Sequence, residues 1–158
     1  MWWAVAVFVA DQASKWWALT SLDPGQPRPF LGDWLRWHLI RNSGAAFSLG
    51  DRATWLLTIL SIVIIVGVLG AARRVTTRAW AVTFGLLLGG ALGNLADRIF
   101  RAPGWFQGHV VDFIDYFGWF IGNVADIAIV VAAILVVLLT LRGQPPTTPR
   151  APVVSDDE

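Results

Sequence analysis

The sequence predicts an all-α integral membrane protein with four transmembrane helices and a small pair of strands on its outer loop. Hydrophobic residues make up 56% of the 158 residues and charged residues only 15%, which is far too apolar for an ordinary soluble domain. Four segments approach the roughly 20 apolar residues that cross a bilayer. The segment between the first two, residues 23–52, is too long for a simple turn.

The four apolar segments are residues 2–22, 53–72, 79 to about 98, and 117–141. The first contains Asp11 and Lys15 and lacks a basic leader, so we expect a retained helix and not a cleaved signal peptide. The second carries no charge and is expected to be scaffold. Residues 1–142 therefore form one transmembrane domain. Residues 143–158 contain four prolines and three terminal acids, and we expect a disordered cytoplasmic tail.

The orientation in the membrane follows from the short loop between the second and third segments. This loop holds Arg73, Arg74 and Arg78 and should be cytoplasmic by the positive-inside rule, which places both termini in the cytoplasm. Arginines also occur in the outer loop, but aspartates are interspersed with them there.

The outer loop contains a strand pattern. Leu35, Trp37 and Leu39 alternate with Arg36 and His38, which is typical of a half-buried strand and predicts a strand pair on the membrane surface. The residues that follow, Asn-Ser-Gly-Ala-Ala-Phe at 42–47, fit an ordinary turn better than a site of close backbone or ligand approach.

Composition excludes several classes of function. The chain has no cysteine, so disulfides, thiol nucleophiles and cysteine-based metal sites are excluded. A net charge of +1 gives no indication of nucleic-acid binding. The ten tryptophans suit both interfacial belts and core packing.

The first helix places an acid and an amine on one face. Asp11 and Lys15 are four residues apart and can pair inside the bilayer, either as a structural ion pair or as part of a site. Ser14 and Lys15 do not form a hydrolase pair, because adjacent helical residues point about 100° apart.

The third helix carries Gly85, Gly89 and Gly93 at intervals of four, a stripe that lets another helix pack closely.

A polar face lies beside the glycine stripe. It consists of Asn94, Asp97 and Arg98. We expect Asp97 to pair with Arg98 at the membrane edge, and Asn94 to need buried partners.

Two further aspartates suggest a carboxylate pair. A helix that begins near Phe117 holds Asp126 below the membrane surface, where an ionised carboxylate costs several kcal/mol. Gly118 and Gly122 allow the chain to turn Asp112 back over Asp126. Asn123 lies three residues before Asp126 and should point to the same place.

Such a pair can act in general acid–base catalysis. One ionised aspartate takes a proton from water while the other, protonated, donates a proton to the group under attack. Two adjacent carboxylates in low dielectric share one proton at neutral pH. This chemistry requires neither a metal nor a cofactor. The chain has no His-Glu-x-x-His motif, and its only glutamate is Glu158.

Five motifs in the same order make the chain resemble the bacterial lipoprotein signal peptidases, or type II signal peptidases. They are Asp-Gln-Ala-Ser-Lys (11–15), Asn-Ser-Gly-Ala-Ala-Phe (42–47), Gly-Gly-Ala-Leu-Gly-Asn-Leu-Ala-Asp-Arg (89–98), Val-Val-Asp-Phe (110–113) and Asn-Val-Ala-Asp (123–126). The resemblance covers the chain up to about Leu141. It implies a four-helix bundle in the bacterial cytoplasmic membrane with an extracytoplasmic β-cradle and active site.

The resemblance also implies an activity and its residues. The family cleaves prolipoproteins immediately before a diacylglyceryl-modified cysteine, within membrane lipid, and is inhibited by cyclic peptides of the globomycin type; a monomer is expected. Catalysis would fall to Asp112 and Asp126. Supporting or substrate-binding roles would fall to Asn42, Asn94, Arg98, Asn123, Asp11, Lys15 and Asp97. We expect Asp115 to face water.

One position departs from the family pattern. The last motif is usually preceded by phenylalanine, whereas this chain has Gly122, so aromatic packing there should come from Phe120 or Trp119.

Two other functions remain open from the residues alone. Buried acids can form a proton or ion pathway, as in membrane transporters, although these acids cluster towards one side of the membrane. An assembly factor whose ion pairs only hold helices together is the second.

Overall fold

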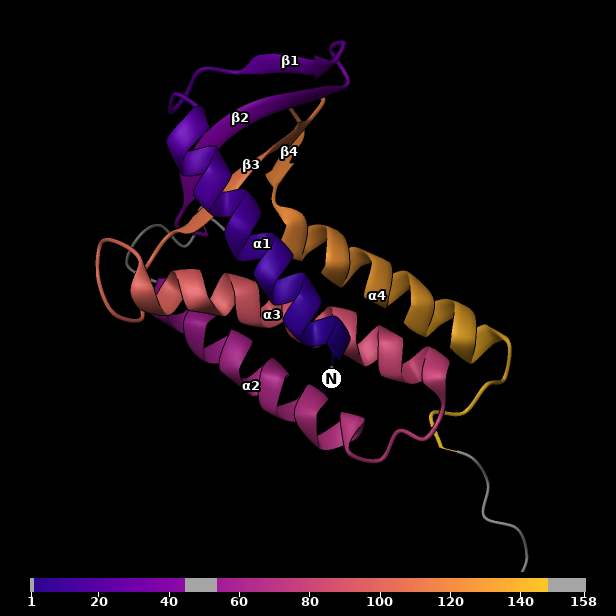
Figure 1. The fold of residues 1–158 in the computed structure, drawn as a ribbon. Coiled ribbons are helices and arrows are strands. Elements are labelled where there is room, and N and C mark those ends of the chain that lie inside the picture. Colours follow the sequence, from indigo (N-terminus) through magenta and orange to yellow (C-terminus); the bar gives the residue numbers. More distant parts are fainter. Residues whose placement is uncertain (1, 45–53, 148–158) are drawn as a thin grey trace, which may run out of the picture.

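The computed structural model describes residues 2–44 and 54–147. Four helices are present in this part of the chain: α1 (Trp2–Ser21), α2 (Thr54–Ala72), α3 (Arg78–Phe100) and α4 (Val124–Leu141). Figure 1 shows α3 between the other helices, and it packs against α1, α2 and α4. Residues 45–53, which include part of the predicted outer loop and of the motif at 42–47, and most of the predicted tail lie outside the described residues.

Among the described helices, three are long and apolar enough to cross a membrane, namely α2, α3 and α4. The predicted helix ends agree with the structure for α1, α2 and α3 to within two residues. The first helix, α1, has 20 residues but is not among these candidate spans. Unlike the other three helices, α1 carries an acid and an amine near its middle, Asp11 and Lys15. Both are buried in the protein and do not face lipid.

An antiparallel sheet of four strands forms a separate layer at one end of the helices (Figure 1). The strands are β1 (Arg28–Leu31), β2 (Leu35–Asn42), β3 (Val110–Tyr116) and β4 (Phe120–Gly122), in that spatial order. The predicted strand at 35–39 is confirmed as part of β2. The all-α class is therefore wrong, and half of the sheet comes from a segment in which the sequence analysis placed no strand.

The predicted start of the fourth helix near Phe117 is also wrong. Phe117 and Gly118 both have positive φ, and the Trp119 N–H donates to the Tyr116 carbonyl at 2.9 Å, which closes a tight turn between β3 and β4. The apolar run masked this turn because a short buried strand and a helix segment cannot be told apart by hydrophobicity alone. Asp126 consequently lies in the first turn of α4 and not several turns below its start.

The predicted glycine stripe on α3 packs against α1. A Cβ at Gly89 would lie 2.7 Å from the Ala4 carbonyl oxygen and 2.7 Å from Val7 Cβ, so only glycine permits this approach. Gly93 similarly has no room for a Cβ, because the Asp11 carboxylate occupies that space. The neighbouring Gly90 faces Ala125 of α4. Because these glycines of α3 have no side chain, α1 and α4 can pack closely against α3, and their polar groups come close together.

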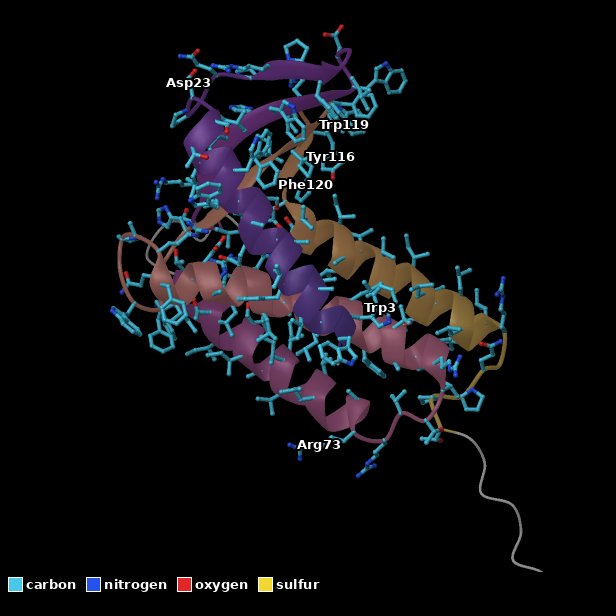
Figure 2. All side chains as sticks on the ribbon, viewed as in Figure 1. Trp3, Asp23, Arg73, Tyr116, Trp119 and Phe120 are labelled. Atoms are coloured by element: carbon cyan, nitrogen blue, oxygen red, sulfur yellow. The ribbon has the colours of Figure 1, made fainter. Side chains whose placement is uncertain are left out.

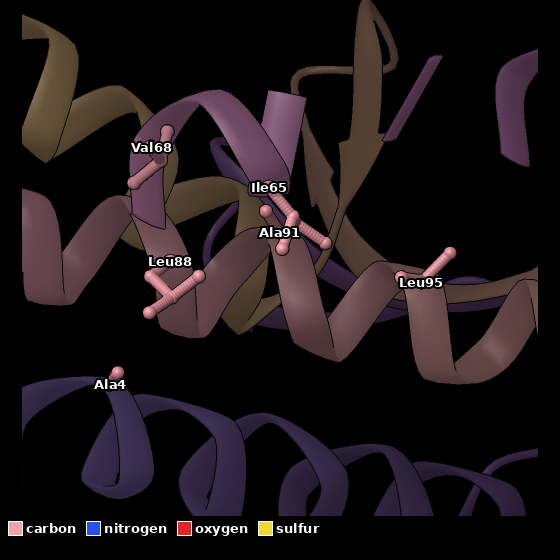
Figure 3. Close-up of a cluster of buried hydrophobic side chains, with 6 residues drawn as sticks. All are labelled: Ala4, Ile65, Val68, Leu88, Ala91 and Leu95. Atoms are coloured by element: carbon pink, nitrogen blue, oxygen red, sulfur yellow. The ribbon is translucent and has the colours of Figure 1, made fainter. Parts of the chain in front are cut away.

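Away from the sheet, an apolar core holds the helices together. Figure 3 shows buried side chains from α1, α2 and α3 meeting in one cluster, made of Ala4, Ile65, Val68, Leu88, Ala91 and Leu95. At the end remote from the sheet, the Thr76 N–H donates to the Pro146 carbonyl and Trp80 Nε1 donates to the Gln144 carbonyl. These bonds bring the α2–α3 loop and the end of α4 together.

We predict that Gly89→Ala destabilises the protein by about 1 to 3 kcal/mol, because the added methyl group forces α1 away from α3. The melting temperature in detergent measures this loss. Gly70→Ala on α2 is the matched control, since a Cβ there meets nothing within 4 Å. Alanine at that position should be neutral or stabilising by up to about 1 kcal/mol. Equal effects of the two substitutions would contradict the close approach of α1 and α3.

Candidate active site

Asp112 is buried in β3, with 2% of its surface exposed, and both of its oxygens accept amide hydrogens. Asn42 Nδ2, at the end of β2, donates to Oδ2 at 2.8 Å, and Asn123 Nδ2 donates to Oδ1 at 2.5 Å. Because β2 and β3 are paired, the sheet itself brings Asn42 to Asp112.

Asp126 lies at the N-terminus of α4, where Asn123 is the N-cap. The Asn123 N–H donates to Asp126 Oδ2 at 3.1 Å, and the Asp126 N–H donates to Asn123 Oδ1 at 3.0 Å, so the two form a capping box. Asn94 Nδ2 donates to the other oxygen, Oδ1, at 2.9 Å. The positive end of the α4 dipole also favours a negative charge on Asp126.

Asn123 joins the two carboxylates. Its backbone binds Asp126 while its side-chain nitrogen binds Asp112, and the same nitrogen also donates to Asn94 Oδ1 at 3.1 Å. The three-residue spacing of Asn123 and Asp126 does direct both groups to one place. It does so through a helix cap and not, as predicted, through one face of a helix.

The orientation of each asparagine amide is fixed by a neighbouring group that can only donate a hydrogen bond, because the amide oxygen must face that donor. Lys15 Nζ, a donor only, faces Asn94 Oδ1 at 2.9 Å, so the amide nitrogen of Asn94 must face Asp126. The Gly44 N–H donates to Asn42 Oδ1 at 2.8 Å and turns the Asn42 nitrogen toward Asp112. The Asp126 N–H fixes Asn123 in the same way.

Lys15 is fully buried and uses all three of its N–H groups. Its Nζ lies 2.9 Å from Asp11 Oδ2, 2.9 Å from Asp97 Oδ2 and 2.9 Å from Asn94 Oδ1. The predicted pairing of Asp11 with Lys15 is confirmed. Lys15 is also the link between α1 and α3.

Asp11 and Asp97 each bind the backbone N–H of the residue that precedes a site aspartate. The Ala125 N–H donates to Asp11 Oδ1 at 3.0 Å, and the Val111 N–H donates to Asp97 Oδ2 at 3.1 Å. The ion cluster around Lys15 therefore holds the backbone beside Asp126 and beside Asp112.

The predicted pairing of Asp97 with Arg98 is wrong. Asp97 Oδ1 instead binds Arg101 Nε at 2.6 Å, one turn further along α3, and Gln12 Nε2 at 3.3 Å. Adjacent helical residues point apart, so Arg98 could not reach the same place. Sequence reasoning missed Gln12 and Arg101, although the four-residue spacing from Asp97 to Arg101 was a usable signal.

The Arg98 side chain does not join the ion cluster around Lys15. Among the described residues its Nη1 has no hydrogen-bond partner although it is buried, and its charge interacts with those of Asp112 and Asp126. A buried guanidinium nitrogen without a partner is costly unless a ligand completes it.

The prediction that Asp115 faces water is wrong. It is 1% exposed, and its Oδ2 binds Arg36 Nε at 3.0 Å and Nη2 at 2.7 Å across the β2–β3 pair. Its Oδ1 accepts the Gly118 N–H at 2.7 Å and supports the turn before β4. Simple strand alternation from Asp112 does not decide burial here, because the sheet is covered on both faces at this end.

Burial raises the pKa of Asp112 to about 7; the hydrogen bond from Asn42 lowers it, and the charge of Asp126 raises it further. The site thus contains two interacting carboxylates, and the pKa of Asp112 lies near neutrality. No group of three or more histidine or acidic side chains within residues 2–44 and 54–147 is placed to hold a metal ion.

A family model described as signal peptidase (SPase) II matches residues 3–142. The chain belongs to the signal peptidase II family. Similar curated proteins are the lipoprotein signal peptidases of Mycobacterium avium and Mycobacterium tuberculosis, which are 48% and 47% identical over 140 residues. These matches cover 89% of this chain and 77% and 69% of the relatives. The enzyme of Streptomyces coelicolor is 48% identical over 145 residues, 90% of this chain and 71% of that protein.

Two solved structures support the fold. Both are described as bacterial membrane enzymes determined by the in meso method, at 1.9 and 2.3 Å resolution. The first is 28% identical with a TM-score of 0.75 and covers 89% of this chain and 90% of its own. The second is 29% identical with a TM-score of 0.76 and covers 94% and 90%.

As a member of the signal peptidase II family, the chain is a membrane peptidase that acts on prolipoproteins and removes their signal peptides. The predicted family and activity are confirmed by these comparisons.

We predict that Lys15→Met lowers the free energy of unfolding by about 3 to 5 kcal/mol, because it leaves Asp11 and Asp97 buried without their shared cation. Thermal unfolding in detergent measures the loss. Arg28→Ala serves as the control, since the Arg28–Asp23 pair is more than half exposed on both sides and should contribute little. A Lys15→Met protein that melts with the parent would show that the cluster does not hold the helices.

A second prediction concerns pH. Between about pH 4 and pH 7, the folded protein keeps a proton on Asp112 that the unfolded chain releases, so this group lowers stability as pH rises through that window. Asp112→Asn should remove this component, whose upper limit is on the order of 4 kcal/mol at 1.36 kcal/mol per pKa unit. Chemical unfolding of parent and variant across the window measures it. Parallel stability curves would contradict the raised pKa.

Proposed function

We propose that Asp112 and Asp126 form the catalytic dyad, and that the enzyme cleaves prolipoproteins immediately before a diacylglyceryl-modified cysteine. One observation carries the assignment: Asn123 bonds to the buried carboxylate of Asp112 and to the partly buried carboxylate of Asp126, so the two acids form one unit at the end of the sheet. No other pair of acids among the described residues combines such contact with freedom from a cationic partner, because Asp11, Asp97 and Asp115 are each bound to lysine or arginine.

The two acids divide the proton work according to their surroundings. Burial favours the protonated form of both acids, but at Asp126 the α4 dipole and the Asn123 N–H favour the charged form, so we assign the proton to Asp112 and the charge to Asp126. The Asp126 carboxylate takes a proton from water as the water oxygen bonds to the scissile carbonyl carbon. Asp112 donates its proton to the carbonyl oxygen. When the C–N bond breaks, the proton held by Asp126 passes to the departing amine, and Asp112 recovers a proton from the tetrahedral intermediate.

The supporting residues have separate roles in this proposal. Asn42, Asn94 and Asn123 orient the carboxylates, because their side-chain nitrogens are already bonded to them. Arg98 has a free buried donor and would bind a substrate carbonyl. Asp11, Lys15 and Asp97 position the backbone beside the dyad.

We further propose that α1 is the fourth transmembrane helix and that the sheet lies on the extracytoplasmic side. Asp11 and Lys15 are fully buried in protein, so crossing the bilayer exposes neither charge to lipid. Figure 2 shows Trp3 and Arg73 away from the sheet residues Tyr116, Trp119 and Phe120. The arginine-rich α2–α3 loop at that end supports a cytoplasmic location for both termini.

The partners follow from the same reading. They are diacylglyceryl-modified prolipoproteins, surrounding membrane lipids and cyclic peptide inhibitors of the globomycin type, and we propose that the enzyme acts as a monomer. An ion pathway has less support. The described part of α2 has no charged residue and α4 has only Asp126, so the buried acids do not extend across the bundle.

We predict that Asp112→Asn and Asp126→Asn each abolish cleavage of a lipid-modified prolipoprotein while the protein stays folded. Asparagine nearly keeps the shape of aspartate, but its amide cannot exchange a proton with water or the carbonyl, and its nitrogen cannot accept the hydrogen that the second carboxylate oxygen accepts. Because the acids act together, the double variant should be about as inactive as either single one. Loss of the signal-peptide mass in purified protein measures cleavage.

Two controls separate catalysis from charge and stability. Asp23→Asn changes an exposed acid and should leave turnover unchanged. Asp115→Asn weakens the bonds to Arg36. It should lower the melting temperature, while the rate of the chemical step in the folded protein should change little. Appreciable turnover by folded Asp112→Asn or Asp126→Asn would remove that residue from the dyad.

A further inference from the structure

Gly122 and Phe120 lie on the same face of β4, next to Asp126. A Cβ at Gly122 would meet Phe120 Cε1 at 2.7 Å and Asp126 Oδ2 at 2.9 Å, so the Phe120 ring occupies the space beside the carboxylate. The ring also stacks on Tyr116, with centroids 6.0 Å apart and an angle of 26° between planes. The aromatic packing expected from Phe120 or Trp119 in place of a residue at 122 thus comes from Phe120.

These two aromatic rings form one wall of a groove of about 310 Å³, and α4 forms the other. Figure 2 shows Tyr116 and Phe120 on the sheet beside the start of α4. The lining residues are Tyr116, Phe120, Asp126, Ile127, Val130 and Val131. The groove therefore has a site carboxylate at one end and is otherwise almost entirely apolar.

The groove follows α4 away from Asp126. Ile127, Val130 and Val131 are 43%, 56% and 41% exposed on a helix long and apolar enough to cross a membrane, so the groove continues into a surface that faces lipid. From Asp126 to Val131 the helix rises about 7.5 Å at 1.5 Å per residue, which exceeds the reach of one aliphatic side chain. An occupant can enter from the bilayer without crossing water.

The lining chemistry favours a hydrocarbon chain over a peptide. Apart from Asp126 and the Tyr116 hydroxyl, the lining side chains carry no hydrogen-bonding group. An extended peptide backbone in the groove would leave N–H and C=O groups unpaired, at a cost of several kcal/mol. An alkyl chain has no such groups.

We propose that Phe120 is a specificity-determining residue, and that the groove it forms with Tyr116 and α4 takes one acyl chain of the substrate's lipid. This inference rests on the proposed cleavage before a diacylglyceryl-modified cysteine. The small residue at 122 is what lets Phe120 lie against Asp126 and form the groove wall at the reacting end.

The test uses the purified protein in detergent and one prolipoprotein carrying either acetyl or palmitoyl chains. The parent should prefer palmitoyl in kcat/KM. Phe120→Ala removes the wall and should raise KM for the palmitoyl substrate by about tenfold, equivalent to about 1.4 kcal/mol. KM for the acetyl substrate, whose chains are too short to fill the groove, should change much less. Trp119→Ala is the matched control, since that ring is 94% exposed, lies outside the groove and should leave the preference unchanged.

A residue swap protects the test against general damage. Gly122→Phe should reduce cleavage, because its side chain cannot share the space with Phe120 and Asp126. The double variant Phe120→Gly with Gly122→Phe removes the contact with Phe120 but not the one with Asp126 Oδ2, so it should recover the palmitoyl preference while cleaving more slowly than the parent.

The outcomes separate this inference from the proposed function. If the parent cleaves neither lipid-modified substrate, the proposed function fails. If the parent cleaves both and Phe120→Ala keeps the palmitoyl preference, the acyl-chain groove is overturned while the dyad stands. If Phe120→Ala instead changes the preference for side chains flanking the cysteine, the groove binds peptide and the inference is wrong.

Discussion

The buried ammonium of Lys15 is the interaction on which the rest of the site depends. A single lysine without a partner in this position would be strongly destabilising, so the two carboxylates and one amide oxygen at 2.9 Å are obligatory companions. Arg101 supplies the second cation, which balances the charges of Asp11 and Asp97. Because each of these acids also binds a backbone N–H beside a dyad residue, the ion cluster sets the positions of β3 and α4 relative to α1 and α3. Gly93 makes the cluster possible, since any side chain there would displace Asp11.

Asp112 and Asp126, the proposed dyad, are surrounded by oriented amides and not by cations at hydrogen-bond distance. Amide donors stabilise a carboxylate less than an ion pair does, so they offset burial only in part and leave the pKa of Asp112 near 7. Asp97 and Asp115 show the contrast, because direct bonds to arginine or lysine suit them to structural work. Asp112 is as deeply buried as Asp97 and Asp115, so its partners and not its depth distinguish it from them.

The sheet supplies what the helices cannot. It joins the segment after α1 to the segment after α3, so Asn42, Asp112 and Asn123 arrive at one place although they lie far apart in the chain. The Asp115–Arg36 pair ties β2 to β3 within this layer and supports the turn that leads into β4. The ring of Phe120, the first residue of β4 after this turn, lies beside Asp126. The sheet thus places Asp112 and its amide partner Asn42, while α4 places Asp126.

Local pattern determined the elements whose cause is local. Hydrophobic runs identified α1, α2 and α3, a four-residue spacing identified the Asp11–Lys15 pair, and the glycine stripe identified the close face of α3, because each depends on residues within one or two helical turns. The motifs also brought the dyad residues and their amides to notice. Tertiary structure alone decided that residues 110–122 form a hairpin, that Asp126 begins its helix, and that Asp97 binds Arg101 and Lys15. It also decided that Asp115 is buried. Each of these depends on which strand or helix from elsewhere in the chain packs against the segment. An apolar run with interspersed acids does not reveal that neighbour.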